Sequence, residues 1–325
     1  MEDIIKNLYL NLSKYSDLTN IQKYIHKNWR KNHILSKNIK LFKWQHQFYK
    51  NKIDFLVKKK NKKIVSLLGV INQSRDKKYS EISLAIWHSL NKTSGLSLIL
   101  DIFDNKTIKL IKATTISKNV HELYKTLGFN VQNFNQYYLT NLDKKNQKIT
   151  KNLIKEKFVH NKKNNDVIYK KINKLFFYKK NLPNRKYIEW RFCKNPVYEY
   201  YFLSDKSLKL ILICRVVAIK KLRFLSVVDF IGSFRGKKKF INKISQFLKN
   251  KKYHHLEFLH FGTEDLNILS SGLKQTNKKE ILPLLTEPYI GLKKKEILCG
   301  YKSLTKIKKI KIVRADGDAD RPSKK

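Results

Sequence analysis

The stretch NVHELYKTLGF, at residues 119–129, has the clearest local pattern in the chain. Apolar residues at helical spacing predict a helix over 118–127, and Gly128 stands where helices commonly end in a left-handed residue. The segment FNQYYL, at 134–139, predicts a strand directly after it. The sequence therefore indicates a helix, a glycine turn and a strand in close succession.

A second glycine turn lies upstream, between a strand predicted at 81–87 and an apolar helix predicted over 96–103. It consists of Lys92, Thr93, Ser94, Gly95, Leu96 and Ser97. Small residues let the backbone approach a ligand closely, and the first N–H groups of a helix can hold phosphate oxygens. Lys92 adds a positive charge. The turn predicts a pyrophosphate site, and an ordinary strand–helix connection is the structural alternative.

Together the two motifs resemble the acetyl-CoA-binding fold of the GNAT superfamily of N-acetyltransferases. The phosphate loop of that family reads Arg/Gln-x-x-Gly-x-Gly/Ala, from which Lys92 and Ser97 depart. Its penultimate helix reads Asn…Tyr-x-x-Leu-Gly-Phe, and the matching residues here are Asn119, Tyr124, Leu127, Gly128 and Phe129. The resemblance implies acetyl-CoA or another acyl-CoA as co-substrate, held by residues 92–97 and by Asn119.

A narrower resemblance covers nearly the whole chain. The sequence is similar to two-domain acetyltransferase-like proteins found among surface-polysaccharide and lipopolysaccharide biosynthesis enzymes. The matching pieces, in chain order, are Trp29 with 33–35, Leu41-Phe42 with 44–46, 84–87, Trp190-Arg191, Asn195-Pro196 with Tyr198 and Tyr200, 228–232, 287–289 and the tail 316–322. This resemblance implies a small-molecule acceptor, namely an amino sugar or a sugar nucleotide used for surface glycan.

The order of predicted elements occurs twice. After helices over 9–34, each half contains two strands, a glycine turn, a helix, a strand, a second helix ending in glycine, and a late strand. We expect an α+β protein of two tandem acetyltransferase-like domains, each a mixed, mostly antiparallel sheet flanked by helices. The expected acyl-CoA-binding domain spans 1–145, a Lys/Asn-rich linker spans 146–165, and a degenerate C-terminal domain spans 166–325.

Two residues are catalytic candidates. In the wider family a tyrosine at the position of Tyr124 often protonates the departing thiolate, and packing of its ring in the core is the alternative. His88 follows the strand that leads to the first turn. Its ordinary pKa suits a general base, and a surface histidine is the alternative. Glu81, at the start of that strand, is a weaker candidate.

Other residues are candidates for substrate binding. The resemblance implies that His33, Trp44 and His46 line the acceptor pocket, and packing at a helix–strand junction is the alternative. In the second half Arg235 lies in a glycine turn and is a candidate for binding a phosphate of a nucleotide-sugar, and an ordinary strand–helix turn is the alternative. Ile268 stands where the first half has Tyr124, so we expect the second half to lack the proton donor.

The formal net charge is +46, from 71 basic and 25 acidic residues, and only nine of the basic residues are arginines. Lysines spread from end to end, so we expect no specific nucleic-acid partner. The three cysteines are too few and too scattered for a disulfide framework or a zinc site, and we expect no metal. No apolar run is long enough to span a membrane, and the start MEDIIKN is not a secretion signal, so we expect a cytoplasmic protein.

The tail DGDAD, at 316–320, is the densest acidic segment. It fails the pattern of a calcium loop because Arg321 stands where glycine is required, and a frayed terminus or a salt-bridging or site-capping segment are the remaining interpretations. The function expected from the whole sequence is acyl-CoA-dependent acyl transfer to an amino sugar or sugar nucleotide. The alternatives are an aminoacyl or peptidyl transferase and a non-catalytic binding protein with two degenerate domains. The oligomeric state stays open.

Overall fold

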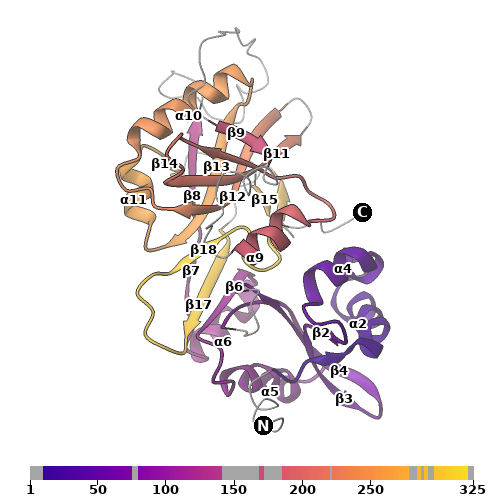
Figure 1. The fold of residues 1–325 in the computed structure, drawn as a ribbon. Helices are drawn as coiled ribbons and strands as arrows, with labels where there is room; N and C mark the ends of the chain where they lie inside the picture. Colours follow the sequence, from indigo (N-terminus) through magenta and orange to yellow (C-terminus); the bar gives the residue numbers. More distant parts are fainter. Residues whose placement is uncertain are drawn as a thin grey trace.

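The computed structural model describes residues 10–74, 80–140, 168–171, 185–219, 222–277, 284–286, 289–291 and 296–320. Within these ranges the chain forms two large mixed sheets with helices packed against them, one in each half of the molecule (Figure 1). No helix in the described part is both long and apolar enough to cross a membrane.

The first sheet has the strand order β3-β4-β5-β6-β17-β7. All neighbours are antiparallel except β5 and β6. The strands are β3 Phe55–Lys60, β4 Lys63–Asn72, β5 Glu81–Ser89, β6 Leu110–Ile116, β17 Leu298–Ser303 and β7 Asn130–Asn133. The strand predicted at 81–87 is confirmed, and β4 and β5 are both rich in the branched apolar residues that favour sheets.

Helices surround this sheet. The expected helical segment at 9–34 is divided into the 3₁₀ turn η1 Tyr15–Asp17, the helix α2 Leu18–Tyr24, the π-helical turn η2 Ile25–Trp29 and the start of α3 Ile34–Lys37, and α4 Ile39–His46 follows. A short ladder pairs β1 Ser13–Lys14 with β2 Lys52–Ile53. The turn KTSGLS opens α5 Lys92–Phe103, and the motif NVHELYKTLGF forms the 3₁₀ turn η3 Lys118–Val120 and α6 His121–Thr126. Gly128 has φ +81° and ends that helical segment, as predicted.

The second sheet has the order β14-β8-β13-β12-β11-β10-β9, and β18 also pairs with β13. Its strands are β14 Lys274–Gln275, β8 Asn135–Thr140, β13 His255–Gly262, β12 Leu222–Gly232, β11 Leu210–Ile219, β10 Tyr201–Ser204, β9 Ile168–Lys171 and β18 Lys311–Val313. The helical elements of this half are α9 Arg185–Ile188, the π-helical turn η5 Glu189–Cys193, α10 Lys238–Asn250 and α11 Asp265–Ser270. A separate hairpin joins β15 Leu284–Thr286 to β16 Tyr289–Gly291.

The two sheets exchange strands. The strand β8, expected to complete the first sheet, pairs with β13 of the second from His255↔Thr140 to His260↔Asn135. In return β17, expected in the second half, lies between β6 and β7 of the first sheet (Figure 1). The expected placement of these two strands is therefore wrong. Strand pairing is decided by long-range backbone hydrogen bonds, which leave no local signature in the sequence. A single cut near residue 145 does not separate the two sheets.

Residues 314–317, 319 and 320 are buried and Asp318 is half-buried, so the frayed interpretation of the tail at 316–320 is excluded. Arg314 and Glu257 form an ion pair of 2.8 Å with both side chains fully buried. Asp320 accepts hydrogen bonds from Arg215 at 2.8 Å and from the hydroxyl of Tyr200 at 2.7 Å. Burial opposes ionisation of Asp320, yet the neighbouring arginines hold the pKa of its carboxyl below the ordinary value. The salt-bridging interpretation of the tail is confirmed.

Candidate functional site

A cavity of about 970 Å³ opens where β5 and β6 diverge. The two strands pair in parallel only from Glu81↔Leu110 to Leu84↔Ala113, and residues of both strands beyond these pairs line the cavity. Further walls come from Trp29 and His33, from the first turn of α5, and from η3 and α6. The cavity is thus a wedge between two parallel strands, with a helix N-terminus at its mouth.

The first turn of α5 is shaped by its cap. The side chain of Asn91 accepts a hydrogen bond from the N–H of Ser94 at 2.9 Å. The first N–H groups of a helix have no carbonyl oxygen of the same helix to bond. In α5 these are the N–H groups of Lys92 and Thr93, so they are the donors that this turn offers to an anion. Lys92 is exposed at the rim of the cavity.

Gly95 lies buried in this first turn and fulfils a packing role. A Cβ atom built there would lie 2.7 Å from the Cβ of Ser89. The indole Nε1 of Trp87 donates to the carbonyl oxygen of Gly95 at 3.0 Å. The absence of a side chain therefore lets α5 lie directly on the end of β5.

A β-bulge interrupts β5 inside the wedge. Between the pairs Leu68↔Trp87 and Val70↔Leu84, the strand β4 has one residue, Gly69, whereas β5 has two. A bulge places a residue outside the regular ladder and redirects its backbone groups. The two residues of β5 are Ala85 and Ile86, and Ala85 lines the cavity.

Tyr124 of α6 lines the cavity from the opposite side and is 6% exposed. Its ring makes edge-to-face contacts with Trp87, at a centroid distance of 5.6 Å, and with Phe129 at 5.0 Å. Burial raises the pKa of its hydroxyl well above the ordinary value, and the charge of Asp318 raises it further. The hydroxyl therefore keeps its proton at neutral pH.

His88 lies near the end of β5 and also lines the cavity. Its Nδ1 lies 2.9 Å from the hydroxyl of Tyr24, and its ring contacts the edge of Trp29 at a centroid distance of 5.8 Å. Burial lowers the pKa of His88, so the ring is neutral at pH 7. The structure thus brings Tyr124 and His88 to one cavity.

Only some of the other sequence candidates reach this cavity. Lys92, Gly95, Leu96, Asn119 and His33 line it, whereas Thr93, Ser94 and Ser97 do not. Ser94 instead bonds Ser66 and Asn91, and the Ser97 hydroxyl donates to the carbonyl oxygen of Ser94.

Trp44 and His46 do not line the cavity. The indoles of Trp44 and Trp190 stack at 5.3 Å, and each N–H donates to the other residue's carbonyl oxygen, at 3.0 and 2.7 Å. His46 is fully buried beside Phe42 and Phe55. Both side chains are therefore engaged in packing, which was the alternative to a role in the acceptor pocket.

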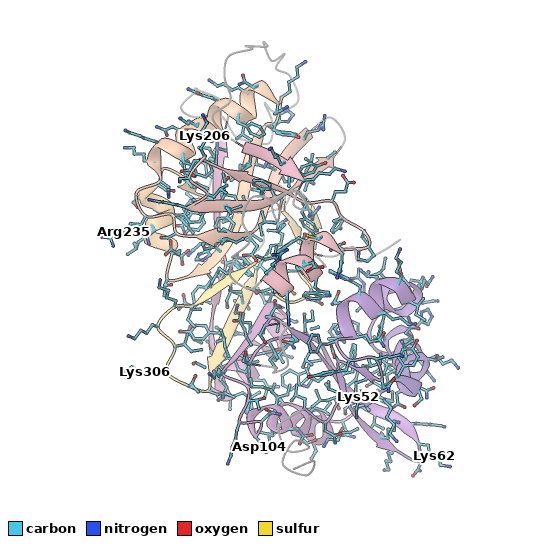
Figure 2. The ribbon with its side chains drawn as sticks, viewed as in Figure 1. Lys52, Lys62, Asp104, Lys206, Arg235 and Lys306 are labelled. Atoms are coloured by element: carbon cyan, nitrogen blue, oxygen red, sulfur yellow. The ribbon has the colours of Figure 1, made fainter. Side chains whose placement is uncertain are left out.

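Glu81 lies outside the cavity, where it bonds the buried amine of Lys112. Arg235 is exposed at the outer edge of the second half (Figure 2) and does not line the wedge. The four lysines labelled in Figure 2 are spread over both halves of the molecule. Among the described residues no group of three or more His, Cys, Asp and Glu side chains gathers as a metal site would require.

Asp318 lines the cavity from the C-terminal tail, a position that no local sequence signal indicated. The acidic pattern DGDAD was noted, but only the fold shows that Asp316 and Asp320 are buried whereas Asp318 faces the wedge half-buried. Gly317 allows the tail to pass close to Thr114 of β6. Its φ is +65°, and a Cβ atom at this position would lie 2.7 Å from Oγ1 of Thr114.

The second half has the same parallel arrangement, but the chain itself fills the wedge. The strands β12 and β13 are parallel over Leu225↔Leu256 to Val227↔Phe258. Beyond that point β18 pairs with β13, and Ala315 donates its N–H to the carbonyl oxygen of Val228 on β12. Ile268 of α11 is fully buried and has no proton to donate.

Comparison with solved structures identifies this fold. A GCN5-related N-acetyltransferase from Anabaena variabilis matches 90% of this chain and 72% of its own, with a TM-score of 0.52 and 9% identity. A protein of Enterococcus faecalis, described as a probable N-acyltransferase, matches the same shares with a TM-score of 0.46 and 10% identity. A glucosamine N-acetyltransferase region of a fungal multi-domain β-N-acetylglucosaminidase matches 90% of this chain and 38% of its own, with a TM-score of 0.44 and 13% identity. No family model and no curated protein matches the chain.

Proposed function

We propose that the protein transfers an acyl group from acyl-CoA, with acetyl-CoA as the expected donor, to an amine. The proposal starts from the fold: the chain has the fold of GCN5-related N-acetyltransferases, and the predicted α+β class with two tandem acetyltransferase-like domains is confirmed. The observation that carries this proposal is the wedge between β5 and β6, which holds a neutral histidine and a protonated tyrosine in one cavity.

His88 is the general base of this proposal. The Tyr24 hydroxyl lies 3.0 Å from the carbonyl oxygen of Val65 as well as 2.9 Å from Nδ1 of His88. A tyrosine hydroxyl has one proton, and a carbonyl oxygen can only accept. Both bonds form together only if Nδ1 of His88 donates, which leaves the lone pair on Nε2. That nitrogen accepts the proton that the amine loses as its nitrogen bonds to the thioester carbon.

Tyr124 is the general acid. As the carbon–sulfur bond breaks, its hydroxyl donates a proton to the departing thiolate, and the site is restored when the proton held by His88 returns through solvent. The bulge at Ala85 and Ile86 supplies backbone N–H groups for the developing oxyanion, and the start of α5 with Lys92 binds the pyrophosphate. No metal is required for these steps.

The acceptor in this proposal is an amino sugar or a sugar nucleotide for surface glycan, as the sequence resemblance implies. Of these two acceptors Asp318 favours the amino sugar, because a carboxylate in the cavity attracts an ammonium group. Two further residues line the cavity: His33 is the proposed contact for the acceptor, and Asn119 is the proposed contact for the cofactor. The expected location stays cytoplasmic, where acyl-CoA is available.

Two measurements test the proposal. Calorimetric titration with acetyl-CoA should show saturable binding, and a chromogenic disulfide should detect release of the CoA thiol that depends on an added amino sugar. Asp318→Asn should raise KM for a cationic acceptor while leaving the Kd for acetyl-CoA within about twofold. Failure of the protein to bind acetyl-CoA would reject the proposal, whereas binding without transfer to any amine would support the non-catalytic alternative.

A further inference from the structure

The tail is fixed on both sides of Asp318. On one side, the carbonyl oxygen of Asp316 accepts a hydrogen bond at 3.3 Å from the hydroxyl of Thr114, on β6 of the first sheet. On the other side, the carboxylate of Asp320 accepts from Nε of Arg215, on β11 of the second sheet, at 2.8 Å. Asp318 itself is half-buried and lines the wedge. Its carboxylate therefore enters the wedge from a segment that is anchored to both sheets.

The peptide group directly before Asp318 is held by Arg191. The Nη2 atom of Arg191 donates to the carbonyl oxygen of Gly317 at 3.2 Å. This carbonyl belongs to the planar peptide group that also contains the nitrogen of Asp318, so its orientation sets the direction in which the chain enters Asp318. Gly317 has φ +65°, and glycine has few steric limits of its own. The bond from Arg191 thus supplies a restraint that the glycine lacks.

Arg191 is itself fixed by contacts from both halves of the chain. It is fully buried in the turn η5 of the second half. Its guanidinium lies 5.3 Å from the ring centre of Trp44, in α4 of the first half, and 5.8 Å from that of Trp190, within the range of cation–π attraction. The reciprocal hydrogen bonds between the two tryptophans join α4 to η5 at the same place. The arginine therefore holds Gly317 from a rigid support.

A role in stability alone does not explain this arginine. Its Nε and Nη1 atoms are buried and have no hydrogen-bond partner among the described residues. Buried donors without partners, on a buried charge, disfavour the folded state, and an apolar side chain of similar size would fill the space without this cost. Arg191 also attracts Asp320, but Arg215 already bonds that carboxylate directly. What an apolar side chain cannot supply is the bond to Gly317.

We propose that Arg191 is a positioning residue of the acceptor site. Through the carbonyl oxygen of Gly317 it holds the carboxylate of Asp318 where that carboxylate attracts a cationic acceptor. The proposal rests on the proposed acyl transfer to an amine and deepens it. The second half, which has Ile268 in place of a proton donor, contributes to the reaction by fixing one wall of the acceptor site.

A double-mutant cycle with glucosamine as the acceptor tests the proposal. Arg191→Met keeps an unbranched side chain and removes the donor, so it should raise KM for glucosamine about five- to tenfold. The Kd for acetyl-CoA should stay within about twofold, because the coenzyme does not depend on Asp318. Asp318→Asn should raise the same KM. The double variant should have the KM of Asp318→Asn alone, since Arg191 acts only through that carboxylate.

Arg191→Lys is the second variant, for use if Arg191→Met does not fold. It keeps the positive charge that attracts Asp320. Its amine ends at the position of the guanidinium carbon, one atom short of the Nη2 that reaches Gly317, so this variant should raise KM in the same way. A merely structural role of the charge would instead leave the KM of Arg191→Lys unchanged.

Tyr137→Phe is the matched control for stability, because it removes a hydrogen bond of 2.7 Å to Asp265 elsewhere in the second half. It should lower the melting temperature and leave KM unchanged. An unchanged KM in both Arg191 variants would overturn the proposal, and so would a KM effect that simply multiplies that of Asp318→Asn in the double variant. A wild-type protein that fails to bind acetyl-CoA or to acetylate glucosamine would reject the proposed function first, and this proposal with it.

Discussion

The carboxylate of Glu264 accepts a hydrogen bond from the backbone N–H of Phe234 at 3.0 Å. The same Oε2 atom accepts from the hydroxyl of Ser233 at 2.8 Å. These donors belong to the glycine turn before α10, which the sequence suggested as an anion site. A carboxylate of the protein itself already occupies that position. Because β18 also fills the wedge beside it, the described part of the second half offers neither a free phosphate turn nor an acyl channel.

This arrangement predicts one coenzyme per chain. Calorimetric titration with acetyl-CoA should give a stoichiometry close to one. Glu264→Gln should leave the stoichiometry unchanged, because β18 still fills the second wedge. A stoichiometry of two in the wild type, lost in a variant of the second turn, would contradict the assignment of the site to the first half.

Tyr124→Phe should lower kcat by about 10²-fold, because the ring is kept and the only transferable proton is removed. The Kd for acetyl-CoA should stay within about threefold, since the hydroxyl acts when the thiolate leaves. Tyr301→Phe, on β17 of the same sheet and outside the cavity, is the control and should turn over normally. A normal rate in Tyr124→Phe would leave this residue with a packing role only.

The pH dependence should report His88. Because burial lowers its pKa, the neutral form persists below pH 6.5, and kcat/KM should be flat around pH 7 and fall only at more acidic pH. His88→Gln should remove this acid limb together with most of the activity. Tyr24→Phe should keep the limb and lower the plateau about tenfold, because the ring loses the partner that fixes its tautomer. An acid limb that persists in His88→Gln would assign the base to another group.

Gly95→Ala should destabilise the protein by about 1–3 kcal/mol, because the new methyl group would overlap Ser89. Coenzyme binding should weaken as well, since α5 must move away from the end of β5. The double variant Gly95→Ala/Ser89→Gly removes the overlapping atoms and should recover much of both losses. Thermal unfolding and acetyl-CoA titration measure the two effects. If the double variant recovers stability but not binding, the glycine itself is required by the ligand.

His255 should make the protein sensitive to acid. It is fully buried against Phe224, and neither ring nitrogen has a partner among the described residues. Burial lowers its pKa from 6.5 to about 3. The unfolded chain takes up a proton below pH 6.5 and the folded chain does not, so stability falls as the pH decreases toward 3. At pH 5 this residue alone should cost about 2 kcal/mol relative to pH 7.

His255→Leu should reduce that loss, because leucine has a similar size and no proton to bind. Denaturant unfolding of the wild type and the variant at pH 7 and pH 5 measures the difference. An equal loss in both proteins would show that other groups cause the acid sensitivity.

Much of the local structure and half of the site could be predicted from the sequence. The motif NVHELYKTLGF forms its own helical segment and stops at Gly128, because apolar spacing and a left-handed glycine act over a few residues. The same holds for KTSGLS, which begins α5. Tyr124 lies in α6 and His88 in β5, and the motifs that contain them are local enough to be recognised in the sequence.

The tertiary structure alone decided the rest. Nothing local distinguishes β8 or β17 from strands of their own halves, and only the pairing of distant backbones exchanges them. The separation of Asp318 from Asp316 and Asp320 likewise depends on partners more than 100 residues away, such as Lys112 and Arg215. Propensity and spacing act within a few residues, whereas burial and charge pairing depend on which distant segments the folded chain brings together.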